Sequence, residues 1–209
     1  MSAFEELARL GVATVHEAMG RQGLVDLPLL QVVPGSRAAG PARIALCGPA
    51  DNLMVHAAVA HAEPGDVLIL TMTEPAPVAL VGDLLVTQAR QQGVAAPLVD
   101  GAVRDLDELR ALGLPVWTRW VRARGATKDH VGALDVPVVV GGAKIEPGDI
   151  VVLDADGAVA VPAAQVDAVT GLAQAREQKE AEVREKYLAG ALSYDLNELR
   201  SIVERDGSS

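Results

Sequence analysis

The sequence predicts an α/β fold that ends in a helical C-terminal extension, and three observations carry this prediction. Between residues 42 and 118, short apolar runs typical of strands alternate with segments of helical periodicity. After Gly125 the pattern changes to Val-rich strands separated by Gly, Pro and Asp turns. Apolar residues make up 50% of the chain but aromatic residues only 2%, so we expect β-rich layers of Val, Leu, Ile and Ala covered by helices.

The first half of the chain contains alternating predicted helices and strands. Residues 3–20 are expected to be helical, and Thr14 and Glu17 have the spacing of a capping box, whose side chains satisfy free backbone amides. Residues 21–38 are expected to be looped or extended because they contain Pro and Gly. Gly93 stands where a glycine commonly ends a helix. We predict strands at 42–47, 67–72, 97–100 and 115–118, and helices at 52–62, 83–92 and 104–112.

The second half is predicted to hold strands first and helices last. Asp154–Gly157 resembles the start of a calcium loop but lacks the downstream Glu, so we expect a hairpin turn there. Gly141 and Gly142 are also expected to form a turn. Strands are predicted at 136–140, 150–153 and 158–161, a charged helix at 163–188 and an amphipathic segment at 195–204.

These elements divide into a core domain, residues 1–162, and a helical extension, residues 163–209. No repeat or linker separates the two parts. Because a charged helix is only marginally stable alone, we expect the extension to pack on a neighbouring subunit.

Composition excludes several classes of function. The net charge of −10 argues against nucleic acid as a partner, because phosphate binding needs a basic face. Cys47 is the only cysteine, so neither an intramolecular disulfide nor a thiolate zinc site is available. The N-terminus lacks the basic and apolar regions of a signal peptide, and no apolar run has the length of a membrane span. We therefore expect a cytoplasmic protein without a membrane partner.

The segment from Gly82 to Asp105 carries the candidate chemistry. Asp83 is followed by twenty residues and then by the pair Arg104 and Asp105. Residues 82–85 and 101–105 are predicted to lie at the carboxyl ends of neighbouring strands, which is where open α/β sheets bind ligands. Carboxylate oxygens suit a hard cation, and a guanidinium suits an anionic substrate. The structural alternative is that both aspartates only cap or start helices.

This pattern resembles the class II 4-hydroxy-4-methyl-2-oxoglutarate / 4-carboxy-4-hydroxy-2-oxoadipate aldolases. Their superfamily also contains the regulator of ribonuclease activity A. The resemblance covers nearly the whole chain and includes GVATVHEAMGRQGL (11–24), DNLMVHAAVA (51–60), EPGDVLIL (63–70), GDLL (82–85), VDGAVRD (99–105), LGLPVW (112–117), DVPVVVGGAKIEPGDIVVLDADGAVAVP (135–162) and KEAEVREK (179–186). It implies a layered α/β/β/α sandwich similar to the swivelling phosphohistidine domain.

The resemblance also implies roles for the motif residues. Asp105 matches the carboxylate that binds a divalent cation, Mg²⁺ or Mn²⁺, and Asp83 matches one that holds water on that metal. Arg104 matches the residue that contacts the pyruvyl group. The amides of Leu84 and Leu85 match those that bind the pyruvate carboxylate.

Two further site residues complete the set. Gly82 is expected to permit close approach of the backbone to the substrate. Glu180 matches a carboxylate supplied by the adjoining subunit, with Glu177 or Glu182 as alternatives. The resemblance thus implies a homotrimer or homohexamer with its site at a subunit interface.

The implied reaction is cleavage of a small anionic 4-hydroxy-2-oxo acid to pyruvate, with oxaloacetate decarboxylation as a second activity. The lysines Lys128, Lys144, Lys179 and Lys186 all lie away from the motif in sequence, so metal–enolate chemistry is favoured over a Schiff base. One alternative keeps this chemistry but changes the 2-oxo acid. Another is a non-catalytic ribonuclease regulator, although those proteins lack the long C-terminal helix and tend to lose the aspartate after the arginine.

Some positions depart from the family or have simpler interpretations. Ala50 replaces a common Gly, and Val81 replaces a common aromatic residue, which could reshape the pocket for the leaving oxo acid. The histidines show no zinc-binding pattern, so surface or core positions are expected for His16, His56, His61 and His130. No G-x-G-x-x-G motif follows a strand, so a nucleotide cofactor is not indicated.

Overall fold

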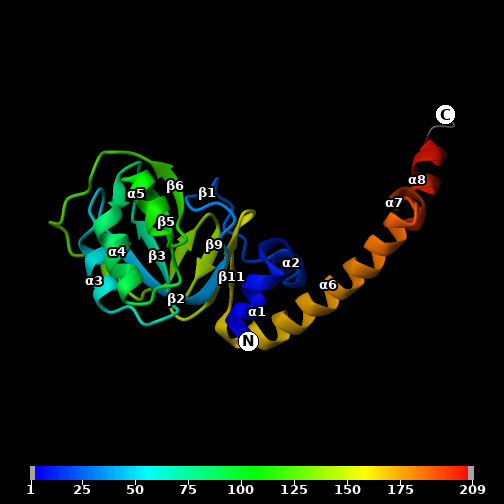
Figure 1. The fold of residues 1–209 in the computed structure, drawn as a ribbon, viewed down its shortest axis with the longest axis horizontal. Helices are drawn as coiled ribbons and strands as arrows, with labels where there is room; N and C mark the ends of the chain where they lie inside the picture. Colours follow the sequence, from blue (N-terminus) through cyan, green and yellow to red (C-terminus); the bar gives the residue numbers. More distant parts are fainter. Residues whose placement is uncertain (1–2, 207–209) are drawn as a thin grey trace.

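The computed structural model describes residues 3–206 and confirms the α/β class (Figure 1). The main sheet has the strand order β1-β6-β5-β3-β2-β10-β11, with β4 beside β5 and β7 beside β2, and β8 and β9 form a separate hairpin. The strands are β1 (Leu30–Gln31), β2 (Ala38–Cys47), β3 (Val67–Met72), β4 (Ala79–Val81), β5 (Ala96–Val103), β6 (Trp117–Val121), β7 (Ala133–Leu134), β8 (Val138–Val140), β9 (Ala143–Ile145), β10 (Ile150–Asp154) and β11 (Gly157–Val161). The helices are α1 (Ala3–Leu10), α2 (Val12–Ala18), α3 (Leu53–Ala60), α4 (Asp83–Gln91), α5 (Leu106–Leu112), the short 3₁₀ helix η1 (Ala163–Gln165), α6 (Val166–Leu188), α7 (Ser193–Leu196) and α8 (Leu199–Asp206).

Strand β2 connects the two halves of the sheet. Its second part, from Ala42 to Cys47, pairs in parallel with β3. Its first part, from Ala38 to Pro41, pairs antiparallel with β10, which continues into the hairpin with β11. A single long strand therefore belongs to a parallel layer and to an antiparallel layer.

Three apolar clusters separate the layers of the fold. Alternate residues of β3 show the pattern, because Leu68 and Leu70 pack with α3, α4 and α5, whereas Val67 and Ile69 pack toward β10 and β11. A third cluster lies between the outer face of β10 and β11 and the helices α1, α2 and α6. This order of helices, sheet, sheet and helices confirms the layered sandwich, while its similarity to the phosphohistidine domain stays a prediction.

The predicted helix over residues 3–20 is two helices, and the capping box at Thr14 and Glu17 is wrong. Gly11 breaks the helix with φ +83°, and α2 begins at the next residue, so Thr14 lies within its first turn. The amide of Val12 donates instead to Asp154 Oδ2 at 2.9 Å. A carboxylate from the β10–β11 turn therefore satisfies the helix N-terminus that sequence reasoning assigned to a local side chain.

Other boundaries differ by small amounts that matter for the site. Strand β5 extends beyond the predicted 97–100 and runs through Gly101 to Val103, where it pairs with β4, a strand that sequence reasoning missed. Helix α5 begins at Leu106 because Asp105 has φ +58°, outside the helical region. The expected turns at Gly141-Gly142 and at Asp154–Gly157 are confirmed as the tips of the β8–β9 and β10–β11 hairpins.

Within the described residues, the C-terminal extension packs on the core only at its beginning. Val169 and Ala173 of α6 are buried against α1 and α2, and Arg9 of α1 pairs with Glu177 at 2.7 Å. Beyond this contact α6 leaves the body of the molecule (Figure 1). Exposed apolar side chains follow along the extension: Leu188, Leu192, Leu196, Ile202 and Val203. The division near residue 162 and the packing on a neighbouring subunit stay predictions.

Within residues 3–206, no helix is both long and apolar enough to cross a bilayer.

Candidate functional site

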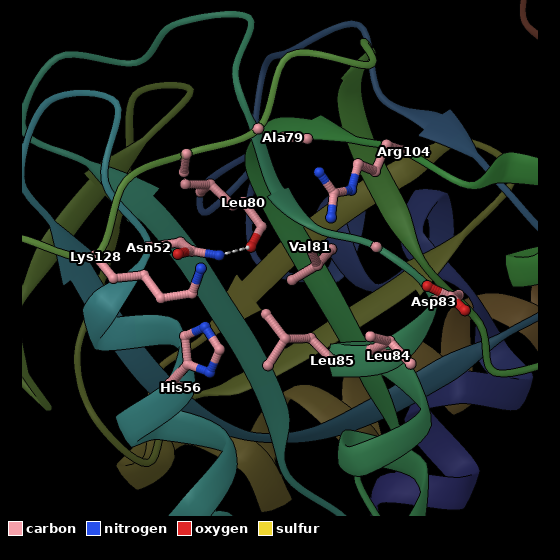
Figure 2. A pocket seen from close by; sticks show the side chains of 13 residues that line it. Asn52, His56, Ala79, Leu80, Val81, Asp83, Leu84, Leu85, Arg104 and Lys128 are labelled. Atoms are coloured by element: carbon pink, nitrogen blue, oxygen red, sulfur yellow. Dashed lines mark hydrogen bonds between the residues drawn. The ribbon is translucent and has the colours of Figure 1, made fainter.

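A cavity of about 230 Å³ opens at the carboxyl ends of β4 and β5 (Figure 2). The N-terminal ends of α3 and α4 and the loop after β6 form its walls. Its lining residues are Asn52, His56, Ala79, Leu80, Val81, Gly82, Asp83, Leu84, Leu85, Arg104, Gly125, Ala126 and Lys128. The expected ligand-binding edge of the sheet therefore carries a real cavity.

The pairing of β4 with β5 brings the two parts of the motif together. Val81 lies opposite Val103 in the parallel register, so Gly82 and Arg104 follow side by side. The amide of Asp83 donates to Asp105 Oδ2 at 3.3 Å, and Arg104 Nε lies 3.5 Å from the same oxygen. Residues separated by twenty positions therefore share one carboxylate oxygen.

The structural alternative holds for the position of Asp83, which starts α4, but it does not describe the geometry of Asp105. Asp105 precedes α5 in the left-handed conformation, and its side chain makes no capping hydrogen bond to that helix. Its carboxylate instead reaches the start of α4, where Gly82 is the N-terminal cap. A left-handed non-glycine residue costs on the order of 1 kcal/mol, and such residues concentrate at functional sites.

Glycines allow Arg104 and Asp105 to lie this close to the backbone. A Cβ atom on Gly82 would lie 2.3 Å from Asp105 Oδ2 and 3.2 Å from Arg104 Nε. A Cβ atom on Gly125 would lie 3.0 Å from Arg104 Nη1. The guanidinium thus lies between two backbone segments that only glycine leaves open.

Two kinds of hydrogen-bond donor remain available at the cavity. The first intrahelical bond of α4 runs from Val86 N to Gly82 O, so earlier amides have no helical acceptor. Asp105 Oδ2 accepts the hydrogen bond of the Asp83 amide. Within residues 3–206, the amides of Leu84 and Leu85 donate to no acceptor. Within the same described residues, the Nη atoms of Arg104 likewise form no hydrogen bond or ion pair. Adjacent free amides at a helix N-terminus suit a carboxylate.

The opposite wall contains three polar residues that sequence reasoning did not assign to the site. Asn52 Nδ2 donates to Leu80 O at 2.8 Å. Within residues 3–206, neither the buried Asn52 Oδ1 nor the buried His56 Nε2 has a hydrogen-bond partner. Burial and the charge of Lys128 lower the pKa of His56. One signal was present in the sequence: Asn52 and His56 are four residues apart on a predicted helix, which puts them on one face.

The expectation that every lysine lies away from the motif is wrong for Lys128. The loop after β6 returns across the sheet edge, pairs with the start of α3 through Asn52 N and Thr127 O at 2.9 Å, and lines the cavity with Lys128. Sequence distance therefore did not predict spatial distance here.

Within one chain, the structure does not bring Glu180 to the motif. Glu180 lies on α6 and pairs with Arg176 at 2.9 Å, while Glu177 pairs with Arg9, which lowers the pKa of Glu177. Among residues 3–206 no group of three or more His, Cys, Asp or Glu side chains could hold a metal. A cation at this edge would have Asp83 and Asp105 as its protein carboxylates from the same chain, and Mg²⁺ is commonly bound by one or two carboxylates plus substrate oxygens.

Comparisons with known proteins agree with this picture. The family model described as RraA-like, Aldolase/RraA, matches residues 12–160. A curated Halalkalibacterium halodurans protein named "Putative 4-hydroxy-4-methyl-2-oxoglutarate aldolase" is 34% identical over 166 residues, covering 79% of this chain and 77% of that protein.

Solved structures with the same fold include two bacterial proteins. Streptomyces coelicolor RraAS2, described as an unusual member of the RNase ES inhibitor RraA protein family, superposes with a TM-score of 0.78 at 31% identity over 87% of this chain and 95% of that one. An uncharacterized protein from Pseudomonas syringae pv. tomato gives a TM-score of 0.79 at 26% identity over 91% of this chain and 94% of that one.

Proposed function

This chain belongs to the Aldolase/RraA family of RraA-like proteins, and from that premise we propose that it is a divalent-metal-dependent pyruvate aldolase. Its substrates are 4-hydroxy-4-methyl-2-oxoglutarate or 4-carboxy-4-hydroxy-2-oxoadipate, cleaved to pyruvate and a second 2-oxo acid. The observation that carries the proposal is that Asp83 and Arg104 line one cavity beside two free amides, while Asp105, which lines a neighbouring hollow with Arg104, accepts from the amide of Asp83 and faces Arg104 Nε.

Asp105 and Asp83 would hold Mg²⁺ or Mn²⁺. Both offer hard oxygen ligands, and the Asp105 side chain is 33% exposed, so it is open to a cation and its water. The bound cation would supply Lewis-acid stabilisation of negative charge on the 2-oxo oxygen.

The protein groups around the cavity bind and polarise the substrate. The amides of Leu84 and Leu85 bind the carboxylate next to the 2-oxo group, and Arg104 donates to the 2-oxo oxygen. The C4 hydroxyl loses its proton, the C3–C4 bond breaks, and C4 becomes a carbonyl. The electron pair of that bond forms the enolate of pyruvate, which is then protonated at C3. Arg104 acts where negative charge develops, so its hydrogen bonds strengthen in the transition state. Decarboxylation of oxaloacetate gives the same enolate.

A complete site in this proposal needs a second copy of the chain. Glu180 lies on the extension beyond the contact of α6 with its own core, near exposed apolar residues that a neighbouring subunit could cover. We therefore propose a homotrimer or homohexamer in which the extension of one subunit reaches the cavity of the next.

The proposal is tested by measuring pyruvate formation from oxaloacetate and from 4-carboxy-4-hydroxy-2-oxoadipate, with Mg²⁺ and with EDTA. We expect both substrates to yield pyruvate in Mg²⁺ and EDTA to abolish release, because the enolate charge then lacks its cation. Pyruvate release from oxaloacetate alone would support the metal–enolate chemistry but indicate a different aldol substrate. A third outcome is pyruvate release that persists in EDTA and is lost when the enzyme is treated with borohydride in the presence of pyruvate. That result would contradict the metal mechanism and assign a Schiff base to Lys128.

A second candidate is a non-catalytic ribonuclease regulator, which the similarity to RraAS2 favours. Against it stands the retained Asp105, since the resemblance implies that the regulators tend to lose this aspartate. Helix α6 does not separate the two candidates, because the match to RraAS2 covers 87% of this chain and so extends beyond the core. Ribonuclease binding without pyruvate release from any 2-oxo acid would support this candidate.

Substitution of Gly82 by alanine tests the crowding around Asp105 and Arg104. The backbone of Gly82 has φ −139°, which alanine adopts freely, but the added Cβ would displace the Asp105 carboxylate. We expect kcat for pyruvate release to fall about 10²-fold, as for a misplacement of catalytic groups near 1 Å, while the thermal unfolding temperature changes little. Gly171→Ala on α6, where a Cβ meets nothing within 4 Å, is the matched control. Unchanged kcat in Gly82→Ala would contradict the proposed site.

A further inference from the structure

One stretch of backbone crosses the open edge of the sheet beside the cavity. Residues 122–130, here called the crossing segment, follow β6 and lie outside the helices and strands of the fold. Its start is bonded to the ends of two strands, because Arg122 N donates to Val103 O at 3.0 Å and Ala79 N donates to Arg124 O at 2.8 Å. Three of its residues line the cavity: Gly125, Ala126 and Lys128.

A buried carboxylate holds the other end of the crossing segment. Asp51 is 0% exposed, and its Oδ1 accepts from Leu53 N at 2.8 Å at the start of α3. Its Oδ2 accepts from Thr127 Oγ1 at 2.7 Å, from Asp129 N at 2.6 Å and from His130 N at 3.2 Å. Burial alone would raise the pKa of Asp51, but these hydrogen bonds lower it well below its usual range. One buried anion therefore joins the crossing segment to α3.

Backbone hydrogen bonds strengthen this junction. Thr127 N donates to Ala50 O at 2.9 Å, and Asn52 N donates to Thr127 O at 2.9 Å. Ala50 has φ +54°, a left-handed conformation that is unfavourable for alanine. Because such a conformation persists only where the surrounding structure enforces it, the junction is a fixed point of the cavity wall.

The middle of the crossing segment lies directly against Arg104. A Cβ atom on Gly125 would be 3.0 Å from Arg104 Nη1, which is closer than an ordinary van der Waals contact. Gly82 leaves as little room on the other side of the same side chain. Within the described part of the chain the Nη atoms have no hydrogen bond, so the two backbone segments restrict their position. Gly125 lies only two residues before Thr127, so the junction controls where this contact falls.

We propose that Asp51 is a positioning residue for the reaction: it holds the end of the crossing segment, keeps Gly125 against Arg104 and so directs the guanidinium into the cavity. The inference rests on the role of Arg104 in the proposed function and adds a residue that acts on the chemistry only through another. A buried carboxylate suits this task because its two oxygens accept four hydrogen bonds, three of them from the crossing segment.

The first test measures kcat and KM for pyruvate release from oxaloacetate in Mg²⁺. In Asp51→Asn an NH₂ group replaces one carboxylate oxygen and faces hydrogen-bond donors, so the junction opens. We expect kcat to fall at least about 10-fold, as for a misplaced catalytic group, with KM nearly unchanged. Thr127→Val removes the 2.7 Å hydroxyl contact alone and should lower kcat in the same direction, which keeps the test valid if Asp51→Asn does not fold.

The matched control removes another buried carboxylate. Asp149 is 8% exposed and accepts from Glu146 N at 2.8 Å and Ala163 N at 3.0 Å, at a turn before β10 that does not line the cavity. Asp149→Asn is therefore expected to retain the native kcat even where it lowers the thermal unfolding temperature. Native kcat in both Asp51→Asn and Thr127→Val, or an equal fall in Asp149→Asn, would overturn the inference.

A double-mutant cycle separates positioning from a merely structural role. If Asp51 acts through the guanidinium, Asp51→Asn causes no further loss of kcat in the Arg104→Lys background. A structural role would instead lower kcat by the same factor in both backgrounds, and that result would contradict the assignment.

The second test needs no turnover. The Nε–Hε signal of Arg104 in the ¹⁵N spectrum of the full chain is assigned by its absence in Arg104→Lys. We expect this proton to exchange with solvent about 10-fold faster in Asp51→Asn, as for the loss of a buried hydrogen-bond acceptor, and at the native rate in Asp149→Asn. Native exchange in both Asp51→Asn and Thr127→Val would refute the positioning role. Faster exchange in a protein that releases no pyruvate from any 2-oxo acid would support the inference and refute the aldolase.

Discussion

Replacement of Asp105 by alanine is expected to abolish metal-dependent pyruvate release. Asp105 Oδ2 is the oxygen that the amide of Asp83 and the Nε of Arg104 share, so its loss removes an anionic ligand and also releases Arg104. We expect kcat/KM to fall by at least about 10³-fold, the size found when charge stabilisation at a reacting centre is lost. The measurement is the initial rate of pyruvate release over a titration of Mg²⁺, in which the variant should show no stimulation.

Two further variants separate this effect from a loss of structure. Alanine at φ +58° adds strain, whereas asparagine tolerates the left-handed region and still offers an acceptor to Asp83 N, so Asp105→Asn removes the charge with less disturbance. Asp107→Ala is the matched control, because Asp107 lies two residues later on α5 and its side chain is 94% exposed. A variant of Asp105 that remained active and responded to Mg²⁺ would refute the assignment of the cation to this edge.

The motif could be predicted from the sequence because its parts are local. Asp83 and the pair Arg104 and Asp105 each follow directly after an apolar strand, and parallel strands end at one edge. Sequence reasoning missed the three-residue strand β4 and expected no strand directly before Gly82, yet it expected residues 82–85 and 101–105 at one edge, where the structure brings Asp83, Arg104 and Asp105 together. The left-handed conformation of Asp105 was not predictable, since aspartate at that position also fits an ordinary helix cap.

The opposite wall could not be predicted because it depends on contacts between distant segments. Asp51 contacts a loop 76 to 79 residues later in the chain, and no periodicity in the sequence encodes that contact. Sequence distance therefore placed Lys128 away from the motif. The same physical reason explains why the predicted capping box at Thr14 is wrong. The true partner of the α2 N-terminus is Asp154, which is 142 residues away from Val12 in the chain.

Substitution of Arg104 by lysine is expected to impair turnover strongly, even though the substitution keeps the positive charge. The guanidinium does two things at once: its Nε faces Asp105 at 3.5 Å, and its Nη atoms remain available to the cavity. A lysine ammonium is a single point charge, and paired with Asp105 it could not also present a planar fork to a 2-oxo acid. We expect kcat to fall about 10²- to 10³-fold, the cost of losing one donor to a developing oxyanion.

The division of that loss between kcat and KM tests the role of Arg104 itself. If its hydrogen bonds form mainly in the transition state, Arg104→Lys lowers kcat and kcat/KM alike and leaves KM nearly unchanged. Arg122→Lys is the control. Arg122 lines a neighbouring hollow together with Arg104 and Asp105, but its Nη1 donates to the backbone oxygen of Val121 at 2.7 Å. A raised KM with native kcat would show that Arg104 contributes only to binding of the substrate in the ground state. Native kinetics in Arg104→Lys would place the reacting 2-oxo group at a different part of the cavity, with the free amides of α4 as its remaining anchor.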